Sequence, residues 1–210
     1  MDNHPQVFTG EETRLYTRIL SFLEALCRQY ERPGEMGQES TREVLILNLM
    51  KVTNDCRAIM LLARSGFYIQ AGILARSTTD ACNLMLHIDV ERDNAIFAER
   101  WLRGRRVTHW MLVESLNKIP LDIDSYRELR RQLDDLVHAN YEGLKLYPTQ
   151  LADPATWGDD AFQSLVFWKS LMVFYLITCL LAVHLIAPDL QQADDYLEAL
   201  LRTYGLPSST

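Results

Sequence analysis

The segment from Gly66 to Asp89, GFYIQAGILARSTTDACNLMLHID, decides how the rest of this 210-residue chain is interpreted. Its length and mostly apolar composition predict one long helix. Four polar residues recur along it at spacings of four, three and four, namely Arg76, Asp80, Asn83 and His87. At about 100° per residue these side chains share one narrow sector of the helix. A polar line on an apolar helix predicts partners: a buried network, a subunit interface or a ligand site.

The bulk composition predicts one soluble domain in the cytoplasm. Hydrophobic residues make up 48% of the chain, which is ample for one core. The net charge of −7 argues against a general polyanion binder but allows a local basic patch. The four cysteines are far apart and form no CxxC pattern, so we expect reduced core thiols. The N-terminus has no positive region followed by an apolar core, so we expect no secretory signal.

Apolar residues recur at helical spacing through most of the chain, and no alternating strand pattern occurs. The predicted helices cover approximately residues 9–31, 43–66, 66–89, 95–118, 123–141, 162–187 and 188–204. We therefore predict an all-α fold, a single helical bundle of about six to seven helices spanning residues 1–210. Residues 1–8 and 205–210 are expected to be frayed tails.

Local signals predict how some of these helices begin and end. Thr9 and Glu12 have the spacing of a capping box at the start of the first helix. Gly66 occupies the place of a C-cap glycine, so the second and third helices should form an antiparallel hairpin. The longest irregular segment, 143–160, is rich in Pro, Gly, Asp and Thr. It is either a functional loop or a loop that only covers part of the surface.

The predicted helix 162–187 contains the strongest apolar run in the chain. The 18 residues from Ser170 to Ala187 carry no Asp, Glu, Lys or Arg. A membrane span needs about 20 such residues, and a helix that is apolar all round is also expected at the centre of a bundle. We favour the central core helix, with a membrane-associated protein as the alternative.

A second polar face is predicted on helix 123–141, where Arg131, Asp134 and His138 share one side. The arginine and the histidine lie two turns apart and could act on one bound group. His138 would then be a general acid/base, Arg131 would stabilise a charged phosphorane-like transition state, and Asp134 would orient the imidazole. The alternative, which spacing alone favours, is a solvated face whose i,i+4 ion pairs contribute a few tenths of a kcal/mol.

The sequence RQLDDLVH, from Arg131 to His138, resembles the Arg-x(4–6)-His motif of the HEPN superfamily. The segment RSGFYIQAGILARSTTDA, with Arg76 and Asp80 as an Arg-x3-acidic pair, also resembles a HEPN-like bacterial family of unknown function. The resemblance covers about residues 45–147. It implies an all-helical and commonly dimeric bundle, with Arg131 and His138 facing a cleft at the dimer axis. Catalytic members of the superfamily are metal-independent endoribonucleases, and many other members are binding modules.

The polar line that opened this section has two interpretations. Arg76 and Asp80 can pair at i,i+4, and Asn83 and His87 could extend the pair into a buried network that sets the register of the bundle. We favour this structural network. The alternative is a pocket that holds an anion on Arg76, with His87 titrating.

A local basic cluster interrupts the acidic chain. Residues 99–110 contain four arginines and one glutamate, a local charge of +3. Arginines with interleaved tryptophans can grip phosphates while bases stack, which predicts nucleic-acid binding by a cluster of Arg100, Arg103, Arg105, Arg106 and Trp101. The alternative is that both tryptophans, Trp101 and Trp110, belong to the core and the arginines pair with carboxylates elsewhere.

These patterns lead to one functional hypothesis and two alternatives. No Glu-x-x-His, zinc, P-loop or dinucleotide motif occurs, so we expect no metal and no cofactor. We expect an interaction or regulatory module, a homodimer that binds RNA or a nucleotide and is linked to defence. Gln132 departs from the small polar or acidic residue usual after the arginine of active HEPN members, so a metal-independent endoribonuclease is the alternative. A membrane-associated helical protein is the third hypothesis.

Overall fold

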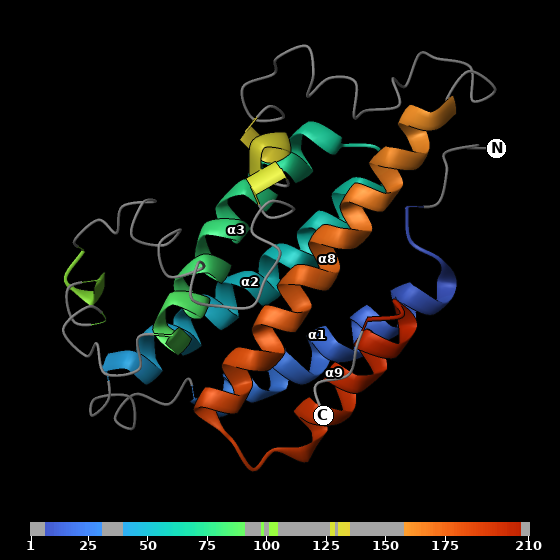
Figure 1. Ribbon diagram of the computed structural model, residues 1–210. Helices are drawn as coiled ribbons and strands as arrows, with labels where there is room; N and C mark the ends of the chain where they lie inside the picture. The colour runs from blue at the N-terminus through green and yellow to red at the C-terminus, as the bar shows by residue number, and fades with distance from the viewer. Residues whose placement is uncertain are drawn as a thin grey trace.

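The computed structural model describes residues 7–30, 40–90, 98, 101–104, 127–128, 130–134 and 158–206. Its helices are α1 (Gly10–Tyr30), α2 (Ser40–Arg64), α3 (Tyr68–Val90), α8 (Gly158–Ile186) and α9 (Gln191–Thr203), which pack together as a bundle (Figure 1). Further helical residues occur at 98, 101–102 and within 127–134. The described residues form helices, turns and bends and no strand, so the predicted all-α fold is confirmed. Most of the predicted helices 95–118 and 123–141 lies outside the described residues.

The first helix, α1, begins at the predicted capping box. The backbone N–H of Thr9 donates to Glu12 Oε2 at 2.7 Å, and the backbone N–H of Glu12 donates to Thr9 Oγ1 at 3.1 Å. These reciprocal bonds satisfy two N–H groups that the helix start leaves without partners. The expected frayed tail is wrong at its inner end, because Val7 and Phe8 are only 1% and 3% exposed. Phe8 packs edge-on against Tyr16, with ring centroids 5.6 Å apart, and this apolar contact holds the chain against α1.

The connection between α2 and α3 is the predicted tight turn. Gly66 adopts φ of +79°, its N–H donates to the carbonyl of Ala63 at 3.2 Å, and the N–H of Phe67 donates to that of Leu62 at 2.9 Å. This pair of bonds is the Schellman motif, which requires a left-handed residue that glycine supplies at little cost. The motif reverses the chain and sets α3 beside α2 as the predicted hairpin.

Helix α8 packs against α1, α2, α3 and α9 (Figure 1). It begins at Gly158, so the predicted irregular segment ends earlier than expected. The side chains of Trp168, Leu171 and Tyr175 on α8 are at most 1% exposed. The part Leu165–Ile186 is long and apolar enough to cross a membrane, and 67% of its most apolar stretch is buried inside the bundle. Such burial is expected for the central helix of a bundle.

Hydrogen bonds join α3 to its neighbours inside the core. The hydroxyl of Tyr175 on α8 donates to the carbonyl of Ala75 at 2.7 Å and lies 2.8 Å from the hydroxyl of Thr79. The hydroxyl of Thr78 lies 2.9 Å from Asp55 Oδ2 on α2. Buried polar groups need such partners, because an unmet hydrogen bond costs about 1–3 kcal/mol. These bonds restrict how α3 can slide against α2 and α8.

The last helix, α9, returns the C-terminal part of the chain to α1. It begins at Gln191, after a short turn, and not at Pro188 as predicted. The hydroxyl of Tyr204 donates to Glu12 Oε1 at 3.0 Å, and Lys169 Nζ of α8 lies 3.0 Å from the same oxygen. Figure 1 shows α1 and α9 side by side. One buried carboxylate thereby links the first and last helices to α8.

Candidate functional site

The polar line of α3 contains the ion pair that its spacing predicts. Arg76 Nη1 lies 2.6 Å from Asp80 Oδ2, one turn later on the same helix. The two side chains lie on the outward side of α3, because Ala75, Thr79 and Cys82 take up its inward side. Arg76 is nevertheless only 22% exposed. Another part of the chain must therefore cover it.

The covering part is residues 127–134, which lie beside α3 in Figure 1. Asp134 Oδ1 accepts a hydrogen bond from Arg76 Nε at 2.6 Å. Arg130 Nη1 donates to Asp80 Oδ1 at 3.1 Å, and Arg130 Nε lies 3.9 Å from Asp134 Oδ2. Each arginine thus contacts both carboxylates. We call this closed set of four residues, Arg76, Asp80, Arg130 and Asp134, the arginine–aspartate network.

The arginine–aspartate network presents its carboxylates to solvent and keeps its arginines beneath them. Asp80 and Asp134 are 47% and 43% exposed as side chains, whereas Arg76 and Arg130 are 22% and 11% exposed. Burial disfavours the charge on Arg76, but its hydrogen bonds to Asp134 and Asp80 outweigh this and raise its pKa. Two positive and two negative charges cancel, so the network attracts a bound anion poorly and joins two elements well.

The other two members of the predicted polar line lie deeper. Asn83 is 0% exposed and His87 is 5% exposed, both on the C-terminal half of α3. The line therefore runs from partly exposed ion pairs into the core. Its first half forms contacts of the kind expected for a structural network, whereas the anion pocket on Arg76 does not fit an arginine held by two carboxylates.

Two of the residues grouped as a catalytic face are described, and they pair with different partners. Arg131 makes two hydrogen bonds to Glu128 on its own segment, at 2.9 Å from Nε and 2.6 Å from Nη2, and is 57% exposed. Asp134 instead turns to Arg76 and Arg130. The predicted acid/base, His138, lies outside the described residues.

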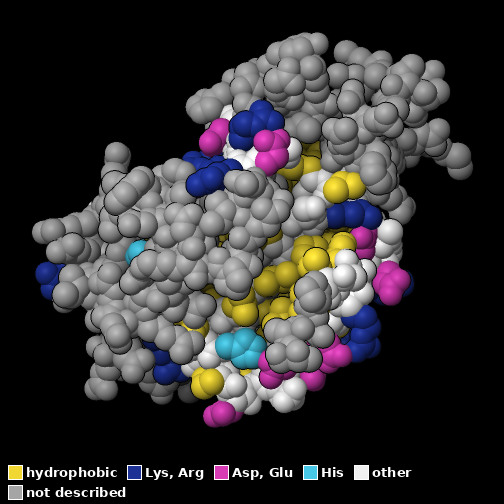
Figure 2. All heavy atoms as spheres, viewed as in Figure 1, with side chains coloured by type: hydrophobic (Ala, Val, Ile, Leu, Met, Phe, Trp, Pro, Cys, Tyr) yellow, Lys and Arg dark blue, Asp and Glu magenta, His cyan; other side chains and the backbone are white. Residues whose placement is uncertain are grey.

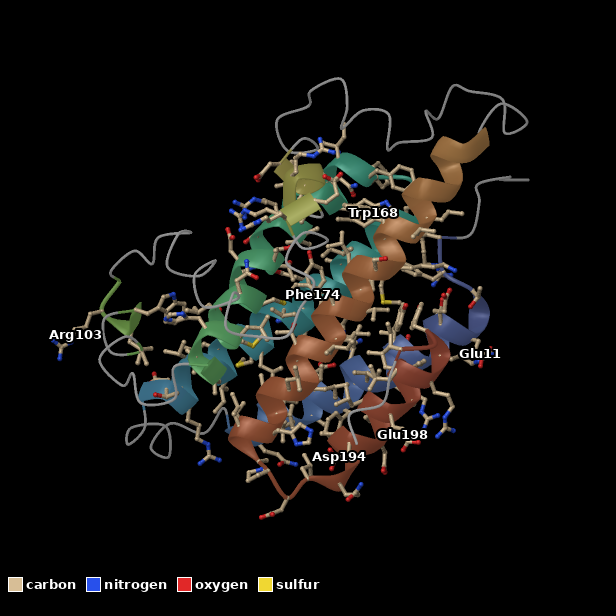
Figure 3. The ribbon with its side chains drawn as sticks, viewed as in Figure 1. Glu11, Arg103, Trp168, Phe174, Asp194 and Glu198 are labelled. Atoms are coloured by element: carbon tan, nitrogen blue, oxygen red, sulfur yellow. The ribbon has the colours of Figure 1, made fainter. Side chains whose placement is uncertain are left out.

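Two members of the basic cluster are described, and they have different environments. Trp101 is partly buried and packs against the core, as its structural alternative predicts. Arg103 is exposed and points outward at the edge of the molecule, away from the segment 127–134 (Figures 1 and 3). The remaining arginines, Arg100, Arg105 and Arg106, lie outside the described residues. The described part of the cluster therefore does not share a surface with Arg131.

Sequence reasoning missed Arg130. This residue is 9% exposed, which is rare for an arginine, and it links Asp80 to Asp134. A signal existed: Arg130 precedes the fully buried Leu133 by three residues and Asp134 by four, so it shares their side of a helix. The exposed neighbour Arg131, and not Arg130, has the spacing to His138 of the Arg-x(4–6)-His motif.

Other chemistry finds no support in the described residues. No group of three or more His, Cys, Asp or Glu side chains among them could hold a metal ion. The four cysteines are buried and free, as predicted. Burial raises the pKa of Cys56, Cys82 and Cys179, which keeps these thiols protonated and poor as nucleophiles.

Comparison of the chain with protein-family models, with curated proteins and with solved structures finds no match. The resemblance to HEPN proteins therefore stays a prediction from the residues quoted above.

Proposed function

We propose that this chain is a non-catalytic interaction module, a HEPN-like helical bundle that works in the cytoplasm by binding another protein chain. The observation that carries the proposal is the placement of Asp134. Its carboxylate lies 2.6 Å from Arg76 Nε and 3.9 Å from Arg130 Nε. In the predicted ribonuclease this carboxylate would orient His138.

The pairing of the arginines supports the same conclusion. A catalytic arginine must be able to reach a phosphorane-like transition state and stabilise its charge. Arg131 holds Glu128 in two hydrogen bonds, and Arg76 and Arg130 each contact two carboxylates. Each of these arginines therefore already has a carboxylate partner with which a phosphodiester would compete. The geometry of the described residues therefore favours a surface that joins elements over one that cleaves RNA.

Exposed apolar side chains support a protein partner. Among the described residues, Leu61, Phe67, Ile69 and Ile73 are 44–67% exposed and fall within 13 consecutive positions. Exposed apolar side chains next to charged ones, such as Ile69 and Ile73 on the turns before Arg76, are typical of protein–protein interfaces. RNA binding would instead draw on the basic cluster, whose Arg103 lies away from the arginine–aspartate network (Figures 1 and 3).

The test is an RNA-cleavage assay on the purified full chain in EDTA, with structured and single-stranded RNA substrates. We expect the wild-type protein to leave both substrates intact, as do the His138→Ala and Arg131→Ala variants. Cleavage by the wild type that is lost in both variants would overturn the proposal. In parallel, fluorescence anisotropy with labelled RNA should show weak binding that Arg103→Glu leaves unchanged; tight binding lost in Arg103→Glu would make RNA the partner.

A further inference from the structure

Helix α9 is held against the bundle by few buried side chains. Seven of its 13 residues are exposed, and only Ala193 and Leu200 are buried. On α8, by contrast, 13 of the 22 residues in Leu165–Ile186 are buried. Elements with few buried apolar contacts open locally while the rest of a protein stays folded. We therefore expect α9 to open at a lower free energy than α8.

A polar cluster fastens the C-terminal end of α9 to the bundle. The Tyr204 hydroxyl donates to Glu12 Oε1 at 3.0 Å and contacts the hydroxyl of Tyr16, a residue that is 0% exposed. Lys169 Nζ lies 3.0 Å from the same oxygen of Glu12. Of these four residues only Tyr204, the C-cap of α9, comes from that helix. We call the four residues the tyrosine latch, because one hydroxyl joins α9 to the other three.

Other contacts of α9 lie closer to solvent. Tyr196 packs on Phe22 of α1, with ring centroids 5.3 Å apart, and the guanidinium carbon of Arg18 lies 5.9 Å from the centroid of the Tyr196 ring. Near the start of α9, His184 Nε2 of α8 lies 3.1 Å from Asp194 Oδ1. These two side chains are 28% and 50% exposed, so water competes for their contact. The tyrosine latch is thus the most buried polar attachment of α9 among these contacts.

The side chains that α9 covers suit an amphipathic helix. Phe22 and Tyr16 supply aromatic surface on α1, and polar groups lie at the two ends, His184 towards the start of α9 and Glu12 towards its end. We call these four residues the α9-covered surface. Figure 1 shows it on the side of α8 away from α3.

The sequence of α9 matches this surface at helical spacing. It presents in turn an acidic residue, a tyrosine ring, a buried leucine and a tyrosine hydroxyl, which are Asp194, Tyr196, Leu200 and Tyr204. A helix of another protein with these side chains at the same spacing could make the same contacts. The seated α9 therefore identifies the kind of segment that this surface binds.

We infer that α9 is an autoinhibitory cover, which opens as a unit when the tyrosine latch is released and gives up its place to a partner's amphipathic helix. The inference rests on the proposed function, because it names the surface through which the chain binds another protein. While α9 is closed, a partner helix finds few open molecules, and its apparent affinity falls by the fraction that is open. The strength of the latch thereby sets the affinity for the partner.

Hydrogen exchange of the full chain, measured by mass spectrometry, tests the opening. Amides of α9 should exchange faster than those of α8. Tyr204→Phe removes the latch hydroxyl and should speed exchange in α9 about tenfold, with exchange in α2, α3 and α8 unchanged. The matched control is Tyr196→Phe, which removes a hydroxyl of the same helix that contacts the exposed Gln192 at 3.5 Å. This variant should exchange like the wild type.

A fluorescent synthetic peptide of residues 188–206 tests the α9-covered surface. The peptide should bind the Tyr204→Phe protein about tenfold more tightly than the wild-type protein, because more molecules of the variant are open. The Tyr196→Phe protein should bind it like the wild type. A peptide with Leu200→Asp should bind none of the three proteins, because the leucine at this position is 0% exposed in the closed helix.

Two results would overturn the inference. One is exchange of α9 at the rate of α8 in the wild type, or an equal acceleration of all helices in Tyr204→Phe. The other is failure of the unmodified peptide to bind the Tyr204→Phe protein. Either result leaves the proposed function standing if RNA stays uncleaved in EDTA, whereas RNA cleavage together with the expected exchange and binding overturns the proposed function alone.

Discussion

Two adjacent arginines in this chain have opposite environments. The side chain of Arg130 is 11% exposed and bridges Asp80 and Asp134, whereas that of Arg131 is 57% exposed and pairs with Glu128. Charged hydrogen bonds are worth more where solvent is excluded, because water competes less for the same groups. Residue type therefore says little here about the energetic role of an arginine, and burial says a great deal.

This contrast leads to a stability prediction. Arg130→Ala should lower the free energy of unfolding by about 1–3 kcal/mol, because it leaves Asp80 and Asp134 without one of their cations. Arg131→Ala, the matched control, should cost less than about 0.5 kcal/mol, as is usual for exposed ion pairs. Urea denaturation monitored by circular dichroism measures both. Equal losses in the two variants would contradict a structural role for the arginine–aspartate network.

Glu12 leads to a prediction about pH. Its burial alone raises the pKa of the carboxyl, but the N–H of Thr9, together with Lys169 and Tyr204, stabilises the carboxylate and leaves its pKa below the usual 4.5. A lowered pKa in the folded state means that the stabilisation is complete above pH 4.5 and is lost as the pH falls through the folded value. The free energy of unfolding should therefore drop as the medium is acidified below about pH 4.5.

The matched variants for this prediction are Glu12→Gln and Glu11→Gln. Glutamine can keep the capping box but not the ion pair with Lys169, so Glu12→Gln should be less stable at neutral pH by about 1–2 kcal/mol and flatter in its acid dependence. Glu11 is exposed and points outward (Figure 3), so its variant should follow the wild-type curve. An unchanged acid slope in Glu12→Gln would show that other carboxyls control the transition.

At the scale of elements, the hairpin of α2 and α3 depends on one backbone conformation. Gly66 has φ of +79°, and its N–H and that of Phe67 close the last turn of α2. Gly66→Ala should lower the free energy of unfolding by about 1–2 kcal/mol, because L-residues with a Cβ are strained in the left-handed region. Gly205→Ala, at φ of +63° beyond α9, tests the same strain at the other end of the bundle. Thermal melts should rank both variants below the wild type.

The face of a helix can combine several roles. On α3, the inward side supplies core residues and hydrogen bonds to α8, and the outward side carries the exposed Ile69 and Ile73 and then the arginine–aspartate network. Figure 2 shows the same mixture at larger scale, with apolar side chains exposed along α8 and charges of both signs where residues 127–134 lie. Neighbouring elements, rather than helical periodicity, decide which parts of such faces are covered.

At the scale of the molecule, α8 decides between a bundle and a membrane protein. Its most apolar stretch is 67% buried, so we expect the protein to remain in the supernatant after ultracentrifugation without detergent. Val166 is 44% exposed and Leu176 is 0% exposed, although both lie in the apolar part of α8. Val166→Asp should be tolerated and Leu176→Asp should unfold the protein, as measured by thermal melts. Recovery of the wild type only from alkali-washed membranes would contradict a soluble bundle.

Much of the fold could be predicted from local patterns. The capping box at Thr9 and Glu12, the C-cap at Gly66 and the i,i+4 pair of Arg76 and Asp80 all depend on residues within one or two turns of each other. The burial of Val7 was not predicted, because this residue precedes the helical pattern of α1. The contact between Asp134 and Arg76 was not predicted, because the two residues lie 58 positions apart along the chain.

The sequence by itself determined the helical class, the hairpin and the polar line on α3, because helix periodicity and capping act over a few residues. Only the tertiary structure decided which residues the side chains of that polar line contact. Residues 127–134 bring Arg130 and Asp134 onto Arg76 and Asp80, and leave Ile69 and Ile73 uncovered on the same side of the helix. Contacts between distant segments depend on how whole elements pack, and no local pattern encodes them.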